Sequence, residues 1–328
     1  MTPDGIPSIT SNSVWDANAP SPIPVAVIGL AARKALGTPG KGVVLAVFER
    51  SFYIKGLGER LACLGSVEIG PGPLNVLCPL PANGGMAALG VTPGTPVIFT
   101  ANALRLDGGA VYSFAEANVW RPPVLPTWRA AELRLGLGAL VTATRASLPD
   151  YGLGPLIPAL AAGGGVAALS TDMFDPLLRP AMRGVAALVE WLYRWAPLVD
   201  GVVPPPPREA EILIGLGPGL TPSGDDFLAG ALITLRVLRR HPAAERLADW
   251  TLSLSATGTG IISQAHLACA TEGAGASALH NALAAVVTPD LVGFDECLSA
   301  VAALGQCSGW DAMAGVTAAC AALATPPA

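Results

Sequence analysis

The sequence predicts an α+β protein, with a β-rich N-terminal barrel or sandwich followed by an α-helical C-terminal domain. In the first half, glycines and prolines separate β-branched and aromatic runs roughly every 8–12 residues, a rhythm typical of short strands. From residue 211 onward, the chain is rich in alanine and leucine in segments of helical length. The second half also carries a glycine-rich loop where a helix is expected to begin.

The β-rich domain is expected over residues 25–125, after a flexible arm at residues 1–24 that is rich in proline, serine and asparagine. Residues 42–55 form a β-branched and aromatic run. Residues 95–120 predict two or three further strands, with a turn at Asp107-Gly108-Gly109. Together these strands predict a small barrel or sandwich.

Residues 126–210 predict a helical connector that ends in a stiff proline-rich spacer. Within it, a helix is expected near residues 174–196, broken near Pro180. Residues 211–328 predict the helical domain, which opens on a short strand or extended lead-in at residues 211–216. Its helices are expected near residues 223–240, 243–255, 259–271, 275–287 and 291–304, with a last helix from 309.

Composition excludes several classes of protein. The chain is 52% hydrophobic and 13% charged, so it is not disordered throughout. It has 24 acidic and 19 basic residues and no basic run, which argues against nucleic acid as a partner. One long uncharged stretch, residues 151–171, contains five glycines and two prolines, so we expect no membrane span there. The N-terminus lacks the basic and apolar regions of a secretory signal, and we expect a cytoplasmic protein.

The cysteines and histidines give no metal motif. None of the six cysteines forms a CxxC pair, and the three histidines have no paired spacing. A zinc site is therefore not expected, and the cysteines are interpreted as small core residues.

One segment carries most of the information: residues 215–230, GLGPGLTPSGDDFLAG. Three alternate glycines, at positions 215, 217 and 219, allow a tight turn and a close approach of the backbone to a ligand. Thr221 before Pro222, or Ser223 with Asp226, would then cap a helix. The free N–H groups of such a helix start favour an anion. The segment is not a P-loop, because acidic residues replace the required lysine, and it lacks the third glycine of a dinucleotide fingerprint.

The acidic pair Asp225-Asp226 constrains the chemistry of this loop. Two carboxylates would repel an anion unless a divalent cation bridges them to it, so Mg²⁺ is a candidate metal. They could also hold an N–H-rich group. Asp226 is expected to face inward with Ser223, because residues three apart share one side of a helix. The alternative is that these residues only cap the helix.

The motif has a second copy 85 residues later. Residues 308–315, SGWDAMAG, share the frame S-G-x-D-x-[LM]-A-G with residues 223–230. Two matching helix N-termini could converge on one ligand. The alternatives are coincidence in a glycine- and alanine-rich chain, or capping at two equivalent packing sites.

Polar residues between the two copies complete the candidate site. Thr259 and Ser263 share a helical face, and His266 follows as a candidate general base or a hydrogen-bonded packing residue. Cys307 is a weaker candidate nucleophile at a helix start. The candidate catalytic residues are Asp226, Asp311, Ser223 and His266. The candidate substrate-binding residues are Gly217, Gly219, Thr221, Ser223, Gly224, Asp225, Thr259, Ser263, Ser308 and Gly309, and the candidate Mg²⁺ ligands are Asp225 and Asp226.

With residues 257–266 and 305–315, the motif at 215–230 resembles a bacterial family whose best-described member is the AllH subunit of oxamate carbamoyltransferase. The resemblance is clearest over residues 211–315, and the first half of the chain is similar in layout only. It implies a role, together with two partner subunits, in moving a carbamoyl group between oxalurate or oxamate and phosphate during anaerobic allantoin (purine) breakdown.

The expected function is therefore that of a carbamoyltransferase component. It would bind carbamoyl phosphate, or a related carbamoyl or ureido anion, at the glycine-rich helix N-terminus. One alternative is a Mg-dependent nucleotide-binding phosphotransferase, against which the missing P-loop lysine counts. Another is a non-catalytic structural subunit of a complex, which the high apolar content favours.

Overall fold

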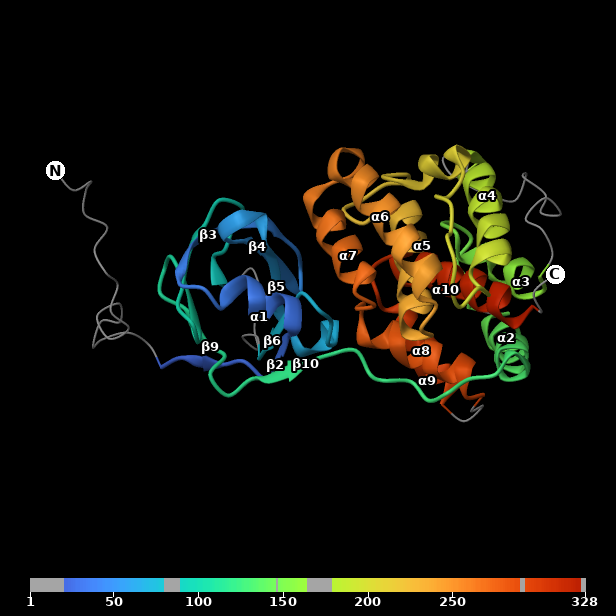
Figure 1. Cartoon of the computed structure of the whole chain (residues 1–328). Helices are drawn as coiled ribbons and strands as arrows, with labels where there is room; N and C mark the ends of the chain where they lie inside the picture. Colours follow the sequence, from blue (N-terminus) through green and yellow to red (C-terminus); the bar gives the residue numbers. More distant parts are fainter. Residues whose placement is uncertain (1–20, 80–88, 146, 164–178, 290–292, 326–328) are drawn as a thin grey trace. The chain divides into compact units, whose positions relative to one another are not determined.

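The computed structural model describes residues 21–79, 89–145, 147–163, 179–289 and 293–325. The chain divides into two compact units, Met1–Trp120 and Arg121–Ala328 (Figure 1). The first unit is built on strands and the second on helices, which confirms the predicted fold class.

The N-terminal unit contains one sheet of ten strands in the order β1-β9-β8-β7-β3-β4-β5-β6-β2-β10. A helix, α1 (Leu30–Leu36), follows β2. The strands are β1 (Ile23–Pro24), β2 (Val27–Gly29), β3 (Gly40–Val47), β4 (Ser51–Lys55), β5 (Leu61–Ser66), β6 (Asn75–Cys78), β7 (Pro96–Phe99), β8 (Ala103–Leu106), β9 (Val111–Ser113) and β10 (Asn118–Trp120).

The sheet must curl, because its two ends are tied together by the chain itself. β1 lies at one end of the order and β2 lies next to the other end, yet only two residues separate them. The curled sheet encloses a core with Phe52, Phe99 and Tyr112. The predicted turn between β8 and β9 is present, and Gly108 and Gly109 have φ angles of 104° and 109° that favour glycine.

The C-terminal unit is helical. Its helices are α2 (Ala130–Thr144), α3 (Ile157–Ala161), α4 (Arg179–Trp195), α5 (Ser223–Val237), α6 (His241–Gly258), α7 (Ile261–Thr271), α8 (Ser277–Val287), α9 (Phe294–Ala302) and α10 (Ser308–Ala324). The helices expected from residue 223 onward are all present, with ends that differ by a few residues. No helix in the described ranges is both long and apolar enough to cross a membrane.

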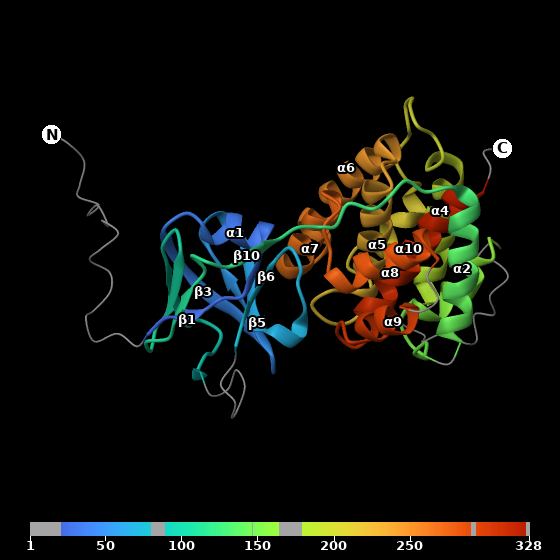
Figure 2. The same cartoon turned by 90° about the horizontal axis from the view of Figure 1, so that it is seen from below.

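Helix α10 lies inside this unit, among α5, α2, α3 and α4 (Figures 1 and 2). Every residue from Gly309 to Ala324 is buried. A helix that is covered on all sides needs small side chains to let its neighbours approach, which explains its run of alanine and glycine.

Three expectations for the middle of the chain need correction. Residues 208–213 form a 3₁₀ helix, η7 (Arg208–Leu213), where a strand or extended lead-in was expected to begin at 211. This segment packs among helices and has no strand of the described residues to pair with. Its backbone groups therefore form hydrogen bonds within a local 3₁₀ turn. Pro180 lies within the described helix α4 (Arg179–Trp195), which runs on past it, while residues 174–178 of the expected helix lie outside the described residues.

The third correction concerns the connector expected at residues 126–210. Leu137 of α2 and Leu188 of α4 share one core cluster with Phe227 and Val316. The connector and the helical domain therefore form one unit. Most of the expected arm lies outside the described residues.

Candidate functional site

The two copies of the motif pack against each other. α5 and α10 lie side by side, and each begins at the serine of its copy, Ser223 or Ser308. A Cβ added to Gly230 would lie 1.9 Å from the carbonyl oxygen of Ala312, and one added to Gly315 would lie 2.0 Å from that of Phe227. The contacts are reciprocal, so the shared final glycine lets two helix backbones touch.

The second glycine of each copy also has a packing role. A Cβ on Gly224 would lie 2.0 Å from the carbonyl oxygen of Leu213, and one on Gly309 would lie 2.0 Å from that of Val301. Both glycines were candidate substrate-binding residues. In the structure, Gly224 packs against the backbone of η7 and Gly309 packs against the backbone of α9.

The hydroxyl groups at the two helix starts meet each other and do not cap their own helices. Neither α5 nor α10 has a side-chain cap, and the cap positions are Pro222 and Cys307. Thr221 Oγ1 lies 2.9 Å from Ser308 Oγ, and Ser223 Oγ lies 3.8 Å from Cys307 Sγ. The capping expected of Thr221 and Ser223 is therefore wrong, because both side chains bond across the helix pair.

Two carboxyl groups lie at these joined N-termini. Asp311 is fully buried, and its Oδ1 accepts a hydrogen bond from the Leu153 backbone N–H. Asp226 is half-buried as a residue, but its Oδ2 atom is fully buried. Among the described residues, neither Asp226 Oδ2 nor Asp311 Oδ2 has a hydrogen-bond partner. Buried polar atoms are rarely left without partners, so these two need an explanation.

The environment of both carboxyls favours their protonated forms. Burial raises the pKa of Asp226 well above its usual value, and the charges of Asp311 and Asp225 raise it further, while Ser308 and Thr221 partly offset the shift. Burial also raises the pKa of Asp311. None of the ion pairs between described residues involves an aspartate of this cluster.

This shift predicts that Asp226 makes stability depend on pH. A carboxyl whose pKa is higher in the folded state binds its proton more tightly there, so stability should fall as pH rises from about 4, the unfolded value, through the folded pKa. Asp226→Asn should remove this loss and be more stable at pH 8, by about 1.4 kcal/mol for each unit of the shift. Urea unfolding at pH 5 and pH 8 measures it. Exposed Asp249→Asn is the control, and parallel pH profiles for wild type and Asp226→Asn would contradict the prediction.

Asp225 faces different partners from Asp226. Its Oδ1 accepts a hydrogen bond of 2.8 Å from the Gly215 N–H, and its Oδ2 accepts bonds of 2.5 and 2.6 Å from the hydroxyls of Thr259 and Ser263. The predicted substrate-binding residues Thr259 and Ser263 thus contact this carboxylate. Asp225 joins the start of α5 to the glycine-rich segment and to α7.

The three alternate glycines have different surroundings. Gly215 has a φ of 70° and packs against the carbonyl oxygen of Gly258, and Gly217 has a φ of 116° and packs against the Ser223 backbone nitrogen. Gly219 has a φ of 92° and open space where a Cβ would be. Of the three, Gly219 is the one with room beside it.

Neither His266 nor Cys307 is charged in this environment. His266 lies on α7, and burial lowers its pKa to about 4, so its imidazole is neutral at pH 7. Burial and the neighbouring Asp311 raise the pKa of Cys307 to about 12, which opposes a thiolate nucleophile.

A segment that the sequence analysis did not single out covers Asp311. Besides the Leu153 bond, a Cβ on Gly152, whose φ is 74°, would lie 2.5 Å from Asp311 Oδ1, and Tyr151 donates a hydrogen bond to the Gln306 carbonyl oxygen. The Tyr-Gly-Leu-Gly sequence within the uncharged stretch was the available signal, because a glycine at a positive φ marks a close approach.

The described side chains form no group of three or more histidine, cysteine, aspartate or glutamate residues that could hold a metal ion. The two candidate Mg²⁺ ligands, Asp225 and Asp226, have separate sets of neighbours, and both oxygens of Asp225 are engaged by protein donors.

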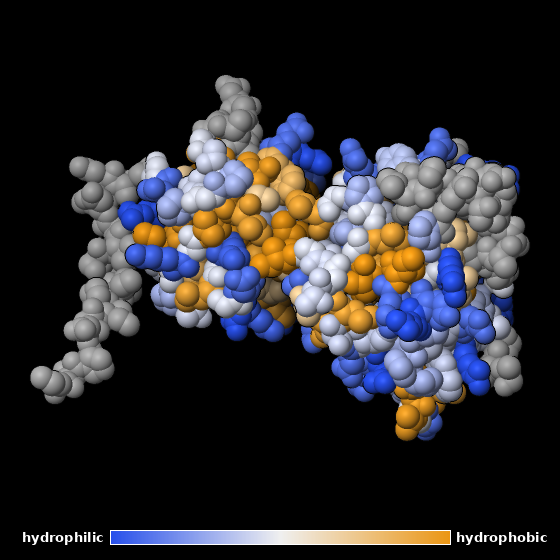
Figure 3. Space-filling view, turned by 90° about the horizontal axis from the view of Figure 1, so that it is seen from above, coloured by the Kyte–Doolittle hydropathy of each residue, from blue (hydrophilic) through white to orange (hydrophobic). Residues whose placement is uncertain are grey.

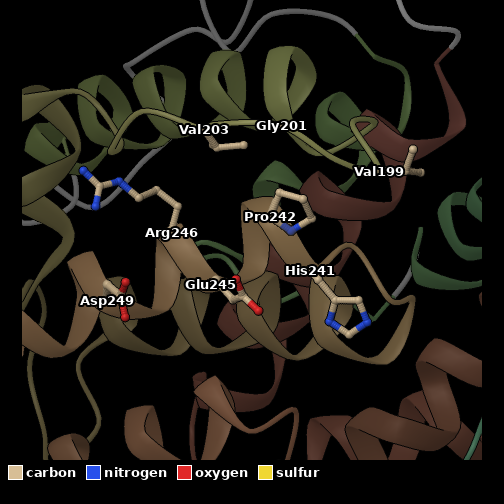
Figure 4. A pocket seen from close by; sticks show the side chains of 8 residues that line it. All are labelled: Val199, Gly201, Val203, His241, Pro242, Glu245, Arg246 and Asp249. Carbon is tan, nitrogen blue, oxygen red and sulfur yellow. The ribbon is translucent and has the colours of Figure 1, made fainter.

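A pocket of about 330 Å³ lies elsewhere in the C-terminal unit, between α6 and the loop before η7 (Figure 4). None of the candidate site residues lines it. Its lining residues are Val199, Gly201, Val203, His241, Pro242, Glu245, Arg246 and Asp249.

Comparison with known proteins agrees with the resemblance seen in the motifs. No curated protein and no solved structure matches the chain. The family model described as oxamate carbamoyltransferase subunit AllH matches residues 213–320, a range that holds both copies of the motif and the Asp225 contacts. Over this segment, the chain is similar to the AllH subunit family of oxamate carbamoyltransferase.

Proposed function

We propose that this chain is a subunit of an oxamate-type carbamoyltransferase, and that the cluster at the N-termini of α5 and α10 binds a small carbamoyl or ureido substrate. The observation that carries the proposal is the pair of buried, unpartnered carboxyl oxygens of Asp226 and Asp311. An unsatisfied buried polar group costs about 1–3 kcal/mol, and a bound ligand is one way to satisfy it.

The chemistry of carbamoyl transfer suits this cluster. The amide nitrogen of oxamate attacks the carbamoyl carbon of carbamoyl phosphate, the carbon–oxygen bond to phosphate breaks, and the proton lost by the nitrogen passes to the departing phosphate. Negative charge develops on the carbamoyl oxygen, which helix N-termini stabilise through their N–H groups. The hydroxyls of Thr221, Ser223 and Ser308 would orient the substrate at this point.

One observation favours a second candidate function, a non-catalytic subunit. Packing alone explains the four glycines of the two copies, at positions 224, 230, 309 and 315. Hydrophobic residues also reach the surface of both units on the face seen in Figure 3, which suits burial against partner subunits. Large exposed apolar side chains include Leu57, Val67, Val199 and Val202.

An assay of the assembled complex separates the two functions. The chain and its partner subunits are mixed with carbamoyl phosphate and oxamate, and phosphate release is measured. We expect Asp311→Asn to lower kcat/KM at least tenfold, about 1.4 kcal/mol of transition-state stabilisation, and exposed Asp249→Asn to leave it unchanged. Full activity in Asp226→Asn and Asp311→Asn complexes would leave the non-catalytic function standing.

A further inference from the structure

We infer that the site holds its ligand by the N–H groups of an uncharged primary amide or urea, through Asp226 and Asp311 together and without a metal ion. The inference rests on the proposed function and names the part of the substrate that the cluster recognises. The phosphate or carboxylate end of the ligand then lies away from the two carboxyls.

The free hydrogen-bonding groups match a primary amide. Asp226 Oδ2 and Asp311 Oδ2 are two buried oxygens without partners, one from each copy of the motif. A primary amide offers two N–H donors and one carbonyl acceptor. A carboxylate accepts the N–H bonds, and a protonated carboxyl can also donate to the carbonyl oxygen.

The surrounding contacts orient Asp311 and hold the two helix starts together, and they bring no cation to the two carboxyls. The Leu153 N–H orients Asp311 through its other oxygen, and the Thr221–Ser308 contact joins the two helix starts. None of the ion pairs between described residues brings a lysine or arginine to the pair. A phosphate buried here would have no lysine or arginine of the described residues beside it to offset its charge, which is costly in a buried site.

The same contacts argue against a bridging cation. Asp225, the other candidate ligand, gives both of its oxygens to Gly215, Thr259 and Ser263. Mg²⁺ usually binds one or two carboxylates together with several waters or substrate oxygens, and with Asp225 engaged only one unpartnered oxygen each of Asp226 and Asp311 is left for it among the described residues. The two remaining oxygens suit N–H donors better.

Three probes test the inference by titration into the full chain assembled with its partner subunits, in EDTA. Oxamate has a primary amide, N,N-dimethyloxamate has the same charge but no N–H, and oxalate has no amide. We expect oxamate to bind at least tenfold more tightly than either analogue. In Asp226→Asn and Asp311→Asn complexes, the ratio of the affinity for oxamate to that for either analogue should fall toward one. In each variant the NH₂ group of asparagine, a donor, replaces a carboxyl oxygen that accepts. Asp249→Asn should keep it.

The outcomes distinguish the inference from the function on which it rests. Three results would each overturn the inference: equal binding of the three probes, loss of oxamate binding in EDTA, or an unchanged preference for oxamate in both variants. In each of these cases, carbamoyl transfer by the wild-type complex would still support the proposed function. A complex that neither binds oxamate nor transfers a carbamoyl group would overturn both. A loss of preference without any drop in thermal stability separates recognition from misfolding.

Discussion

Replacing Gly315 or Gly230 with alanine should destabilise the C-terminal unit by about 3 kcal/mol or more, a larger effect than most single substitutions have. The added methyl group would lie about 2 Å from a carbonyl oxygen of the facing helix, and backbone cannot rotate away as a side chain can. To relieve the overlap, α5 and α10 must separate along a buried interface. The midpoint and slope of urea unfolding measure the loss.

Gly138→Ala is the matched control for this prediction. Gly138 is an exposed glycine within α2, and no atom of the described residues lies within 4 Å of its added Cβ, apart from the neighbours in its own helix. Alanine there should stabilise the protein by about 0.5–1 kcal/mol, because it restricts the unfolded chain and favours the helix. If Gly315→Ala and Gly138→Ala shifted stability equally, the close contact of α5 with α10 would be contradicted.

Asp225→Ala should cost about 3–5 kcal/mol, the second large effect. Three donors converge on this buried carboxylate. Each hydrogen bond to a charged group contributes about 1.5–3 kcal/mol, and contributions to one acceptor do not simply add. The variant would leave the Gly215 N–H and the Ser263 hydroxyl without their acceptor. Chemical denaturation measures the change in unfolding free energy.

Removing one donor should cost less than removing the acceptor. Thr259→Ala deletes a single hydroxyl and should cost about 1–2 kcal/mol, and exposed Asp249→Ala should cost under about 0.5 kcal/mol. An Asp225→Ala protein as stable as the Asp249→Ala protein would mean that the carboxylate does not hold the glycine-rich segment to α5 and α7.

The sequence predicted those parts of the fold that local patterns determine. The helices from residue 223 onward are alanine- and leucine-rich runs with glycine or proline between them, so their ends follow from local signals. The β-rich first half was predicted from its β-branched runs and its Asp107-Gly108-Gly109 turn. The match between residues 223–230 and 308–315 also predicted two equivalent helix starts.

Contacts between distant parts of the chain were beyond such patterns. The sequence predicted Thr221 and Ser223 as helix caps, but their partners are Ser308 and Cys307, more than eighty residues away. The local sequence does not distinguish a hydroxyl that caps its own helix from one that bonds to a distant helix. Neighbouring side chains on a helix point about 100° apart, so the adjacent aspartates need not face one ligand, but no local pattern identifies Thr259 and Ser263 as the donors to Asp225.

The cover over Asp311 was missed for the same reason. Leu153 reaches it from 158 residues earlier in the chain through a backbone N–H, a group that every residue except proline has. Helix composition likewise did not show that residues 126–210 share a core with α5 and α10, because the apolar faces of a connector and of a domain helix look alike.

The most direct test of the site is a crystal structure of the assembled complex with oxamate. We predict that the amide nitrogen lies within hydrogen-bond distance of both Asp226 and Asp311, between the first turns of α5 and α10, with no metal ion beside it. Oxamate bound in the pocket of His241 and Arg246 on α6, or on a partner subunit alone, with these two carboxyls still unpartnered, would contradict it.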